Sequence, residues 1–403
     1  MGIIFSCLSI QNIKTLFWEK SRKYLSFFLL IALFSIFHSP YGNEPWSYYP
    51  YLFQLLIPSL FFYSIASHEP IKKFVIQSLW IVFASSLIEC LLAIIQYFMQ
   101  QPLGLYKLGE PALFAIISVP DKTLWWLGRF FQTSSFSHEI FRAAGTLPHP
   151  NILGCFAGFA LFISYFLYLS INKKRNRWFF ILPLFLQMFA LFVTYSRAAI
   201  FGTLLASLLW FGWFFYKKIT HVRALLMKTL LCSVLSALFL LPQLIERGGI
   251  INYNTCSKNS DQARLVYQAH AVEKMKQHSI CGIGFHQYLV SMKENQEKGD
   301  AVHNIFLLIA TECGLLGLIA FLCFIGSLVW HTFKKLNPLI VTLYAILLFL
   351  LFMGCCHYDL IKSQQERILF FLTCGLLALY SEGAPAFSNV KEEQRKTTQI
   401  KET

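Results

Sequence analysis

Long apolar runs alternate with short polar segments along most of the chain. A helix that crosses a bilayer needs roughly 20 apolar residues, and ten runs approach that length. They cover residues 24–38, 47–67, 74–98, 150–171, 178–195, 198–216, 224–242, 303–330, 338–356 and 367–381. The pattern predicts an all-α, polytopic membrane protein of about ten transmembrane helices, in which residues 1–381 form a single membrane domain.

The composition agrees with this class of protein. Of the 403 residues, 56% are hydrophobic and only 13% are charged, whereas a soluble domain carries roughly 25% charged residues. A net charge of +14 also occurs in proteins that bind nucleic acid. Here the basic residues sit in short clusters between apolar runs, which is typical of cytoplasmic loops and argues against nucleic acid as a partner.

The basic clusters recur at every second connection between the apolar runs. Lysine and arginine precede the first run and follow the second, fourth, sixth, eighth and tenth runs. Because such clusters stay on the cytoplasmic side, this alternation predicts ten spans with both termini in the cytoplasm. Residues 382–403 are polar and rich in lysine and glutamate, so we expect them to form a disordered cytoplasmic tail.

Two connections on the opposite, outer side are long, at residues 99–149 and 243–302. Loops of this length are usually functional or disordered. The second contains a predicted amphipathic helix over residues 261–276, with an apolar and a polar stripe at helical spacing. The apolar stripe is Leu265, Ala269, Val272 and Met275, and the polar stripe is Arg264, Tyr267, His270 and Lys274. A solvated face is the usual explanation of such a polar stripe, and a place in a binding site is the alternative.

Eleven cysteines are scattered along the chain, and most lie inside apolar runs. There we expect them to behave as small hydrophobic residues. Only Cys256 and Cys281 share a long polar loop. If that loop is periplasmic, the two can form a disulfide.

Three polar motifs lie where chain segments enter the membrane from the outer side. They are Arg142, His149 and Asn151 around the start of the fourth run, Ser196 and Arg197 between the fifth and sixth runs, and His303 and Asn304 at the start of the eighth run. In the predicted topology these helices begin at the outer face, where free N–H groups carry partial positive charge. Together with Arg264, the arginines predict a site for phosphate or diphosphate.

Each candidate residue also has a simpler interpretation. An arginine as close to the membrane core as Arg197 is a functional hypothesis by default, but it can also snorkel to the interface and mark the tight hairpin. Arg142 can bind either a substrate phosphate or a lipid headgroup. His303 has the chemistry of a general base, or it caps the helix together with Asn304. His149 and Asn151 flank Pro150, which is also ordinary helix initiation.

Two carboxylates, Glu89 and Glu312, lie inside apolar runs. Intramembrane carboxylates are rare, so we expect each to have a partner, and Glu312 is a candidate to tune His303. The chain has no Asp-x-Asp pair, no His-Glu-x-x-His motif and no Walker loop. The sequence therefore predicts neither a metal site nor another cofactor.

At these motifs the sequence resembles the O-antigen ligase and O-antigen polymerase superfamily, bacterial inner-membrane glycosyltransferases of lipopolysaccharide biosynthesis. The resemblance extends from about Arg142 to Gly326. Its elements are Arg142-x-x-Gly145, His149-Pro150-Asn151-x-x-Gly154, Thr194-x-Ser196-Arg197, Arg264 followed by Cys281-Gly-Ile-Gly284, and His303-Asn304 followed by Glu312-x-Gly314-x-x-Gly317-x-x-x-Phe321.

The resemblance implies a multi-pass protein of the bacterial inner (plasma) membrane with its active site on the periplasmic face. Members of this superfamily transfer a glycan from undecaprenyl diphosphate to an acceptor sugar hydroxyl, and the ligases do so without a metal. The expected partners are a lipid-linked glycan donor, a lipid-linked or other glycan acceptor, and membrane lipid.

The resemblance also implies roles for individual residues. Arg197 and Arg264 would bind the diphosphate, and His303 would activate or position the acceptor hydroxyl, so these three are the candidate catalytic residues. The candidate substrate-binding residues are Arg142, His149, Asn151, Ser196 and Asn304.

Two other functions remain open from the sequence. A polymerase of the same superfamily would use a growing lipid-linked glycan as acceptor. A solute transporter is the second alternative, but transporters bind their substrates at broken helices near mid-membrane. The polar motifs of this chain lie at the outer ends of the predicted spans instead.

Overall fold

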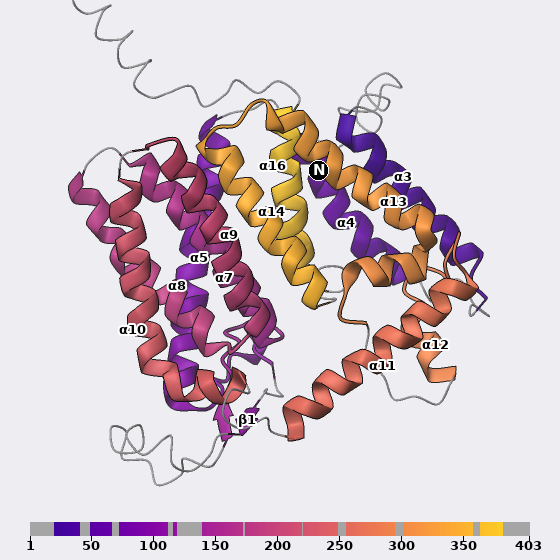
Figure 1. Cartoon of the computed structure of the whole chain (residues 1–403), viewed down its shortest axis with the longest axis horizontal. Coiled ribbons are helices and arrows are strands. Elements are labelled where there is room, and N and C mark those ends of the chain that lie inside the picture. Colours follow the sequence, from indigo (N-terminus) through magenta and orange to yellow (C-terminus); the bar gives the residue numbers. More distant parts are fainter. Residues whose placement is uncertain are drawn as a thin grey trace, which may run out of the picture.

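A computed structural model describes residues 20–40, 49–66, 72–111, 116–118, 139–171, 174–219, 221–248, 255–294, 302–357 and 363–381. The described part is a bundle of helices (Figure 1). Its α-helices are α3 (Lys20–Phe37), α4 (Tyr49–Ala66), α5 (Lys72–Met99), α7 (Pro150–Ser170), α8 (Ile181–Val193), α9 (Arg197–Tyr216), α10 (Val222–Gly248), α11 (Thr255–Gln277), α12 (Tyr288–Glu294), α13 (Ile305–Phe333), α14 (Pro338–Cys356) and α16 (Gln364–Ser381).

Short elements complete the described secondary structure. Two 3-10 turns, η2 (Tyr106–Leu108) and η4 (Lys174–Phe180), accompany an antiparallel ribbon of β1 (Ile116–Ser118) and β2 (Glu139–Phe141). The ribbon pairs Ile116 with Phe141 and lies in the first of the two long predicted loops. The fold is otherwise helical, as predicted.

Each of the ten predicted runs coincides with a helix. Six helices in the described residues are long and apolar enough to cross a membrane. They are α5, α7, α9, α10, α13 and α14, and each candidate span lies within the bounds of its helix. Residues 54–66 and 177–193 form shorter apolar helices. The fold is that of a polytopic membrane protein, and the count of ten spans stays a prediction. The predicted tail at 382–403 lies outside the described residues.

The helices form two groups joined by α14 and α16 (Figure 1). On one side, α8 packs against α5, α7 and α10; on the other, α13 packs against α3, and α16 packs against α4. Helix α7 contacts α5, α8, α9, α10, α14 and α16, and 89% of its most apolar window is buried. Buried Gln187 accepts a hydrogen bond from Ser164 of α7 and donates one to Ser86 of α5. These two hydrogen bonds satisfy the buried side-chain amide of the otherwise apolar helix α8.

Small residues bring the starts of α7 and α9 together. A Cβ on Gly154 of α7 would lie 2.9 Å from the Cβ of Ala199 on α9, so only glycine permits this spacing. The hairpin between α8 and α9 turns at Tyr195, whose φ is 48°, a left-handed conformation that is uncommon for a residue with a side chain. Its ring is buried, at 1% exposure, which holds this tight turn against the bundle.

Polar residues of α5 hold the segment that leads into α7. The Glu89 carboxylate accepts hydrogen bonds from the backbone N–H and the hydroxyl of Thr146. The Gln96 amide oxygen accepts from the N–H groups of Ala144 and Gly145, and its NH₂ group donates to the Gly145 carbonyl at 2.9 Å. Glu89 therefore has the partner that the sequence predicts for it.

Helix α13 is broken at Gly314, where φ is 70° and ψ is −179°. The loop at residues 279–284, which we call the glycine clasp, lies against this break. Two backbone N–H groups of the clasp donate to the carbonyls of Thr311 and Glu312 at 2.9 Å, so the break leaves neither of these carbonyls unpaired. A Cβ at Gly314 would collide with the carbonyl of Ile280. The clasp thus fixes the end of α11 against the start of α13.

The structure corrects one feature of the predicted outer helix. Helix α11 forms as expected, but its polar stripe faces the protein: His270 is buried at 8% exposure, and Tyr267 packs within a buried cluster. Its apolar stripe is the more exposed one, with Leu265 65% exposed, although Val272 and Met275 are half-buried. The interpretation of the polar stripe as a solvated face was wrong, because an apolar face of a membrane protein need not be the face that packs on protein.

Two smaller expectations concern Cys281 and Glu312. Cys281 carries a free thiol, and the side chain of Cys256, its possible disulfide partner, lies outside what the structure describes. Glu312 accepts a hydrogen bond from the backbone N–H of Tyr288 at 3.3 Å and therefore has the expected partner. It lies beside the glycine clasp and is absent from the pocket that His303 lines.

Candidate functional site

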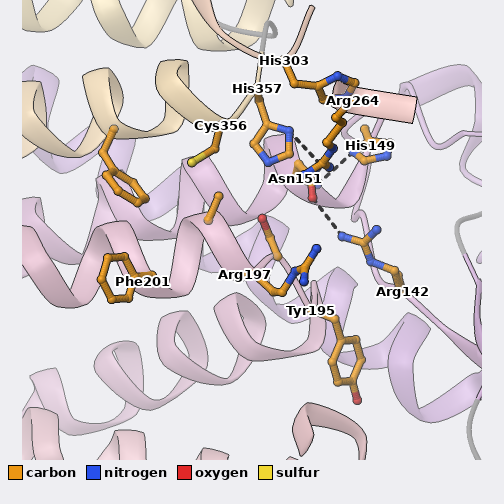
Figure 2. Close-up of a pocket in the computed structure, with 13 residues that line it drawn as sticks. Arg142, His149, Asn151, Tyr195, Arg197, Phe201, Arg264, His303, Cys356 and His357 are labelled. Carbon is orange, nitrogen blue, oxygen red and sulfur yellow. Dashed lines mark hydrogen bonds between the residues drawn. The ribbon is translucent and has the colours of Figure 1, made fainter. Parts of the chain in front are cut away.

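A pocket of about 450 Å³ lies where the three polar motifs of the sequence meet (Figure 2). It is bounded by the segment before α7, the α8–α9 hairpin, α11, His303 before α13 and the end of α14. Its lining residues are Arg142, His149, Asn151, Tyr195, Ser196, Arg197, Ala198, Phe201, Arg264, His303, Phe352, Cys356 and His357. Seven of the eight candidate residues are therefore in one place, and the lining contains no acidic side chain.

Arg142 is held at this pocket by buried hydrogen bonds. Its Nε donates to the Thr194 carbonyl at 2.8 Å, and its Nη2 donates to the Asn151 side-chain oxygen at 2.9 Å. The side chain is only 6% exposed. These contacts join the segment before α7 to the α8–α9 hairpin, so they fix the position of a positive charge that burial would otherwise make costly.

Arg197 is the first residue of α9, and its side chain is exposed at the pocket. The Ser196 hydroxyl caps the helix by accepting a hydrogen bond from the Ala199 N–H at 3.4 Å. Capping of this kind sets the direction in which the first turn of a helix begins. The Arg197 guanidinium therefore lies beside the positive end of the α9 dipole, and both favour an anion at this place.

The second side of the pocket comes from the other group of helices. Arg264 reaches it from α11, and His303 reaches it from the segment that precedes α13. In Figure 2 both lie across the pocket from Arg142 and Arg197. Arg142 and Arg264 thus line the same pocket although they are 122 residues apart in the sequence.

Asn304 is the one candidate residue that does not line this pocket. Its side-chain oxygen accepts hydrogen bonds from the N–H groups of Phe306 and Leu307, at 3.0 and 3.1 Å, and so caps α13. It lines a neighbouring groove with Leu307 and residues of α11. Helix capping accounts for these contacts, and a substrate-binding role for Asn304 stays a prediction.

His149 also caps a helix, because its Nδ1 accepts a hydrogen bond from the Asn151 N–H at 3.1 Å. It nevertheless lines the pocket, and Asn151 does so as well. The two interpretations of this motif are therefore compatible: the same residues begin α7 and contribute polar groups to the pocket.

His357 is a pocket residue that the sequence motifs did not indicate. It caps the carboxyl end of α14, where its N–H donates to the Met353 carbonyl at 2.8 Å, and it is 6% exposed. Its ring centroid lies 6.0 Å from that of His303. One feature of the sequence could have indicated His357: it is a titratable residue directly after an apolar run, at the predicted outer end of that run. Arg197 stands out in the sequence in the same way.

Burial and neighbouring positive charges lower the pKa of His357 to about 3. Burial is the larger cause, and it is followed by Arg264, His303, His149 and Arg142. The carboxyl end of a helix by itself would favour a cation, but desolvation together with the neighbouring arginines and histidines outweighs it. His357 is therefore neutral at physiological pH.

One end of the pocket is apolar. Phe201 of α9 and Phe352 of α14 line it, and their ring centroids lie 5.6 Å apart. Phe201 is 56% exposed, and Figure 2 shows it well separated from Arg142. The pocket thus has a cationic side and an apolar side, an arrangement suited to an amphipathic anion.

The donor set does not point to a metal ion. Within the described ranges, no group of three or more histidine, cysteine, aspartate or glutamate side chains has the geometry to hold one. Positive charge at the pocket comes from arginine, whose planar fork binds phosphate oxygens in pairs.

Comparison with known proteins gives one family match, over part of the chain. Residues 182–322 match the family model described as O-antigen ligase. The matched range contains Arg197, Arg264 and His303, while Arg142 and His357 lie outside it. No curated protein matches the chain. The family match supports membership of this chain in the O-antigen ligase superfamily.

Proposed function

We propose that this protein is an O-antigen ligase-like glycosyltransferase that moves a glycan from undecaprenyl diphosphate to an acceptor sugar hydroxyl without a metal. The observation that supports this most directly is the convergence of Arg142, Arg197, Arg264 and His303 on one pocket. A diphosphate needs several fixed positive groups. The apolar side at Phe201 and Phe352 would accommodate the first units of the lipid carrier.

The proposed reaction assigns a role to each side of the pocket. The acceptor hydroxyl oxygen attacks the anomeric carbon of the donor sugar, and the bond from that carbon to the phosphate oxygen breaks. Undecaprenyl diphosphate leaves with the electron pair, and Arg197 and Arg264 stabilise the charge that develops on it. His303 accepts the proton of the hydroxyl. Attack opposite the leaving group inverts the configuration of the sugar.

The proposal also places the pocket in the cell. Basic residues cluster at the ends of the helices opposite the pocket, for example Lys217 and Lys218 after α9 and Lys334 and Lys335 after α13. With these in the cytoplasm, the pocket faces the periplasm of a bacterial inner membrane, and both termini are cytoplasmic.

The test is transfer by the purified full-length protein, with a polyprenyl-diphosphate-linked glycan, candidate acceptors and a chelator of divalent metals. We expect Arg197→Ala to lower the transfer rate by about 10²–10³, the loss typical of removing one transition-state donor. Lys217→Ala, at the opposite end of the same helix, is the matched control and should transfer at the wild-type rate. Wild-type transfer by the Arg197 variant excludes the proposed diphosphate clamp.

A deletion strain separates the ligase from the polymerase of the same superfamily. Loss of a ligase leaves no glycan on the acceptor, whereas loss of a polymerase leaves single repeat units attached. The first result supports the proposed ligase. The second result indicates a polymerase, whose acceptor is a growing lipid-linked glycan.

A further inference from the structure

His357 stands at the end of a chain of polar contacts that crosses the pocket wall. Arg142 donates to the Asn151 side-chain oxygen at 2.9 Å, and the Asn151 side-chain nitrogen lies 3.3 Å from Nδ1 of His357. Figure 2 shows these two contacts as consecutive dashed lines. The state of His357 is therefore connected to the buried arginine.

The direction of these hydrogen bonds follows from the chemistry of arginine. A guanidinium has only donors, so Asn151 must turn its oxygen toward Arg142. The Asn151 NH₂ group is then the donor toward His357, and Nδ1 of His357 must accept. A neutral imidazole that accepts at Nδ1 carries its proton on Nε2. The contacts thus select one tautomer, and they disfavour the doubly protonated ring, which has no acceptor.

The electrostatics of the pocket act in the same direction. Arg142 lies before α7, His149 caps α7, Arg264 comes from α11 and His303 precedes α13; all four disfavour a positive charge on His357. Arg197 and Cys356 also line the pocket beside it. In Figure 2 the second ring nitrogen of His357 is turned away from Asn151, toward the open part of the pocket. A donor N–H there faces the space between the arginines.

We propose that His357, fixed as the neutral Nε2–H tautomer by Asn151, is a further diphosphate-binding residue that donates a hydrogen bond to a phosphate oxygen. This inference rests on the proposed function, because it requires the diphosphate to bind among the arginines. A neutral donor adds a hydrogen bond without adding positive charge beside His303. It therefore leaves the basicity that His303 needs as a proton acceptor.

The test measures equilibrium binding of inorganic pyrophosphate to the full-length protein in lipid nanodiscs. Isothermal titration calorimetry gives the dissociation constant. His357→Phe should weaken binding by about tenfold to a hundredfold, the effect of losing one hydrogen bond to a charged group. His357→Gln, whose amide nitrogen takes the place of Nε2, should remain within about threefold of the wild type. His331→Phe is the matched control, because this histidine lies in the last turn of α13, at the end far from the pocket. This variant should bind pyrophosphate as the wild type does.

The pH dependence distinguishes a neutral donor from a cation. With a pKa of about 3, His357 stays neutral from pH 8 to pH 6, so the ratio of wild-type to His357→Phe affinity should not change over that range. In Asn151→Ala the ring stays neutral over this range, because burial and the neighbouring charges remain, but the Nε2–H tautomer is no longer selected. Pyrophosphate affinity relative to the wild type should therefore fall by a similar factor at every pH, and an unchanged affinity contradicts the role of the tautomer. This second variant decides the matter if His357→Phe does not fold.

The outcomes separate this inference from the proposed function. Wild-type binding by His357→Phe, with binding lost in Arg197→Ala, overturns the role of His357 alone. A His357→Gln variant as weak as His357→Phe, with a wild-type ratio that grows at low pH, overturns the neutral donor. Failure of the wild type itself to bind pyrophosphate, with no difference in Arg197→Ala, contradicts the proposed function.

Discussion

The two sides of the pocket are built in different ways. The first side, Arg142, His149, Asn151, Ser196 and Arg197, belongs to α7, α9 and the segments just before them. The second side, Arg264 and His303, belongs to α11 and the segment before α13. His357, at the end of α14, lies between them.

The first side is fixed by the packing of the whole bundle. Helix α7 contacts α5, α8, α9, α10, α14 and α16, and Arg142 is buried by hydrogen bonds to Thr194 and Asn151. The second side depends on fewer elements, because α11 packs mainly on α13 and leaves Leu265 and Ala269 exposed. Its position is set by the glycine clasp at residues 279–284. One half of this pocket is therefore held by the packed helices of the bundle, and the other half by a few backbone hydrogen bonds.

Among the substitutions that compare the two sides of the pocket, the largest expected effect is at the break in α13. Gly314→Ala places a Cβ against the Ile280 carbonyl, at a φ of 70° that alanine rarely adopts. The clasp must then move, and Arg264 and His303 move with it. We expect transfer to fall about a hundredfold, since misplacement by about 1 Å can cost that much. The measurement is transfer by folded protein, checked by its melting temperature.

Gly326→Ala is the matched control, because it makes the same substitution in the same helix with nothing within 4 Å of the new Cβ. It should keep the wild-type rate and stabilise α13 by up to about 1 kcal/mol. If Gly314→Ala transfers as well as Gly326→Ala, the second side does not depend on the clasp.

Substitutions of Arg142 and Arg264 should have effects of intermediate size. The two variants should differ in their free energy of unfolding, but both should lose transfer activity. Arg142→Ala leaves the Thr194 carbonyl and the Asn151 oxygen without their buried donor, which should lower the free energy of unfolding by about 1–3 kcal/mol. Arg264→Ala, on a half-buried residue of α11, should change it by less than about 1 kcal/mol. Both should transfer poorly. Equal stability losses, measured by denaturant unfolding in mixed micelles, contradict the contrast between the two sides.

The smallest expected effect concerns the contact between α12 and α11. The Tyr288 hydroxyl donates to the Tyr267 carbonyl at 2.7 Å, and Tyr288→Phe should cost about 0.5–1.5 kcal/mol of unfolding free energy. Transfer should stay within about threefold, because the clasp still holds α11. Tyr267→Phe retains the carbonyl that accepts this bond and should be closer to the wild type in the same unfolding experiment.

The sequence by itself determined the helices and the kind of chemistry. Each apolar run became a helix because burial of apolar side chains and internal pairing of backbone groups are local requirements of a bilayer. Polar residues such as Arg197 and His303 stood out against these runs for the same reason. Their residue types already indicated an anion site with a base.

The tertiary structure decided where these residues meet and which way they face. The spacing of α7 and α9 at Gly154, the break at Gly314 and the inward polar stripe of α11 depend on contacts between distant segments. No local pattern encodes such contacts. His357 was missed for this reason, since its position beside Asn151 joins residues 206 apart. Hydropathy acts along the chain, whereas a binding pocket forms only where packed helices bring their ends together.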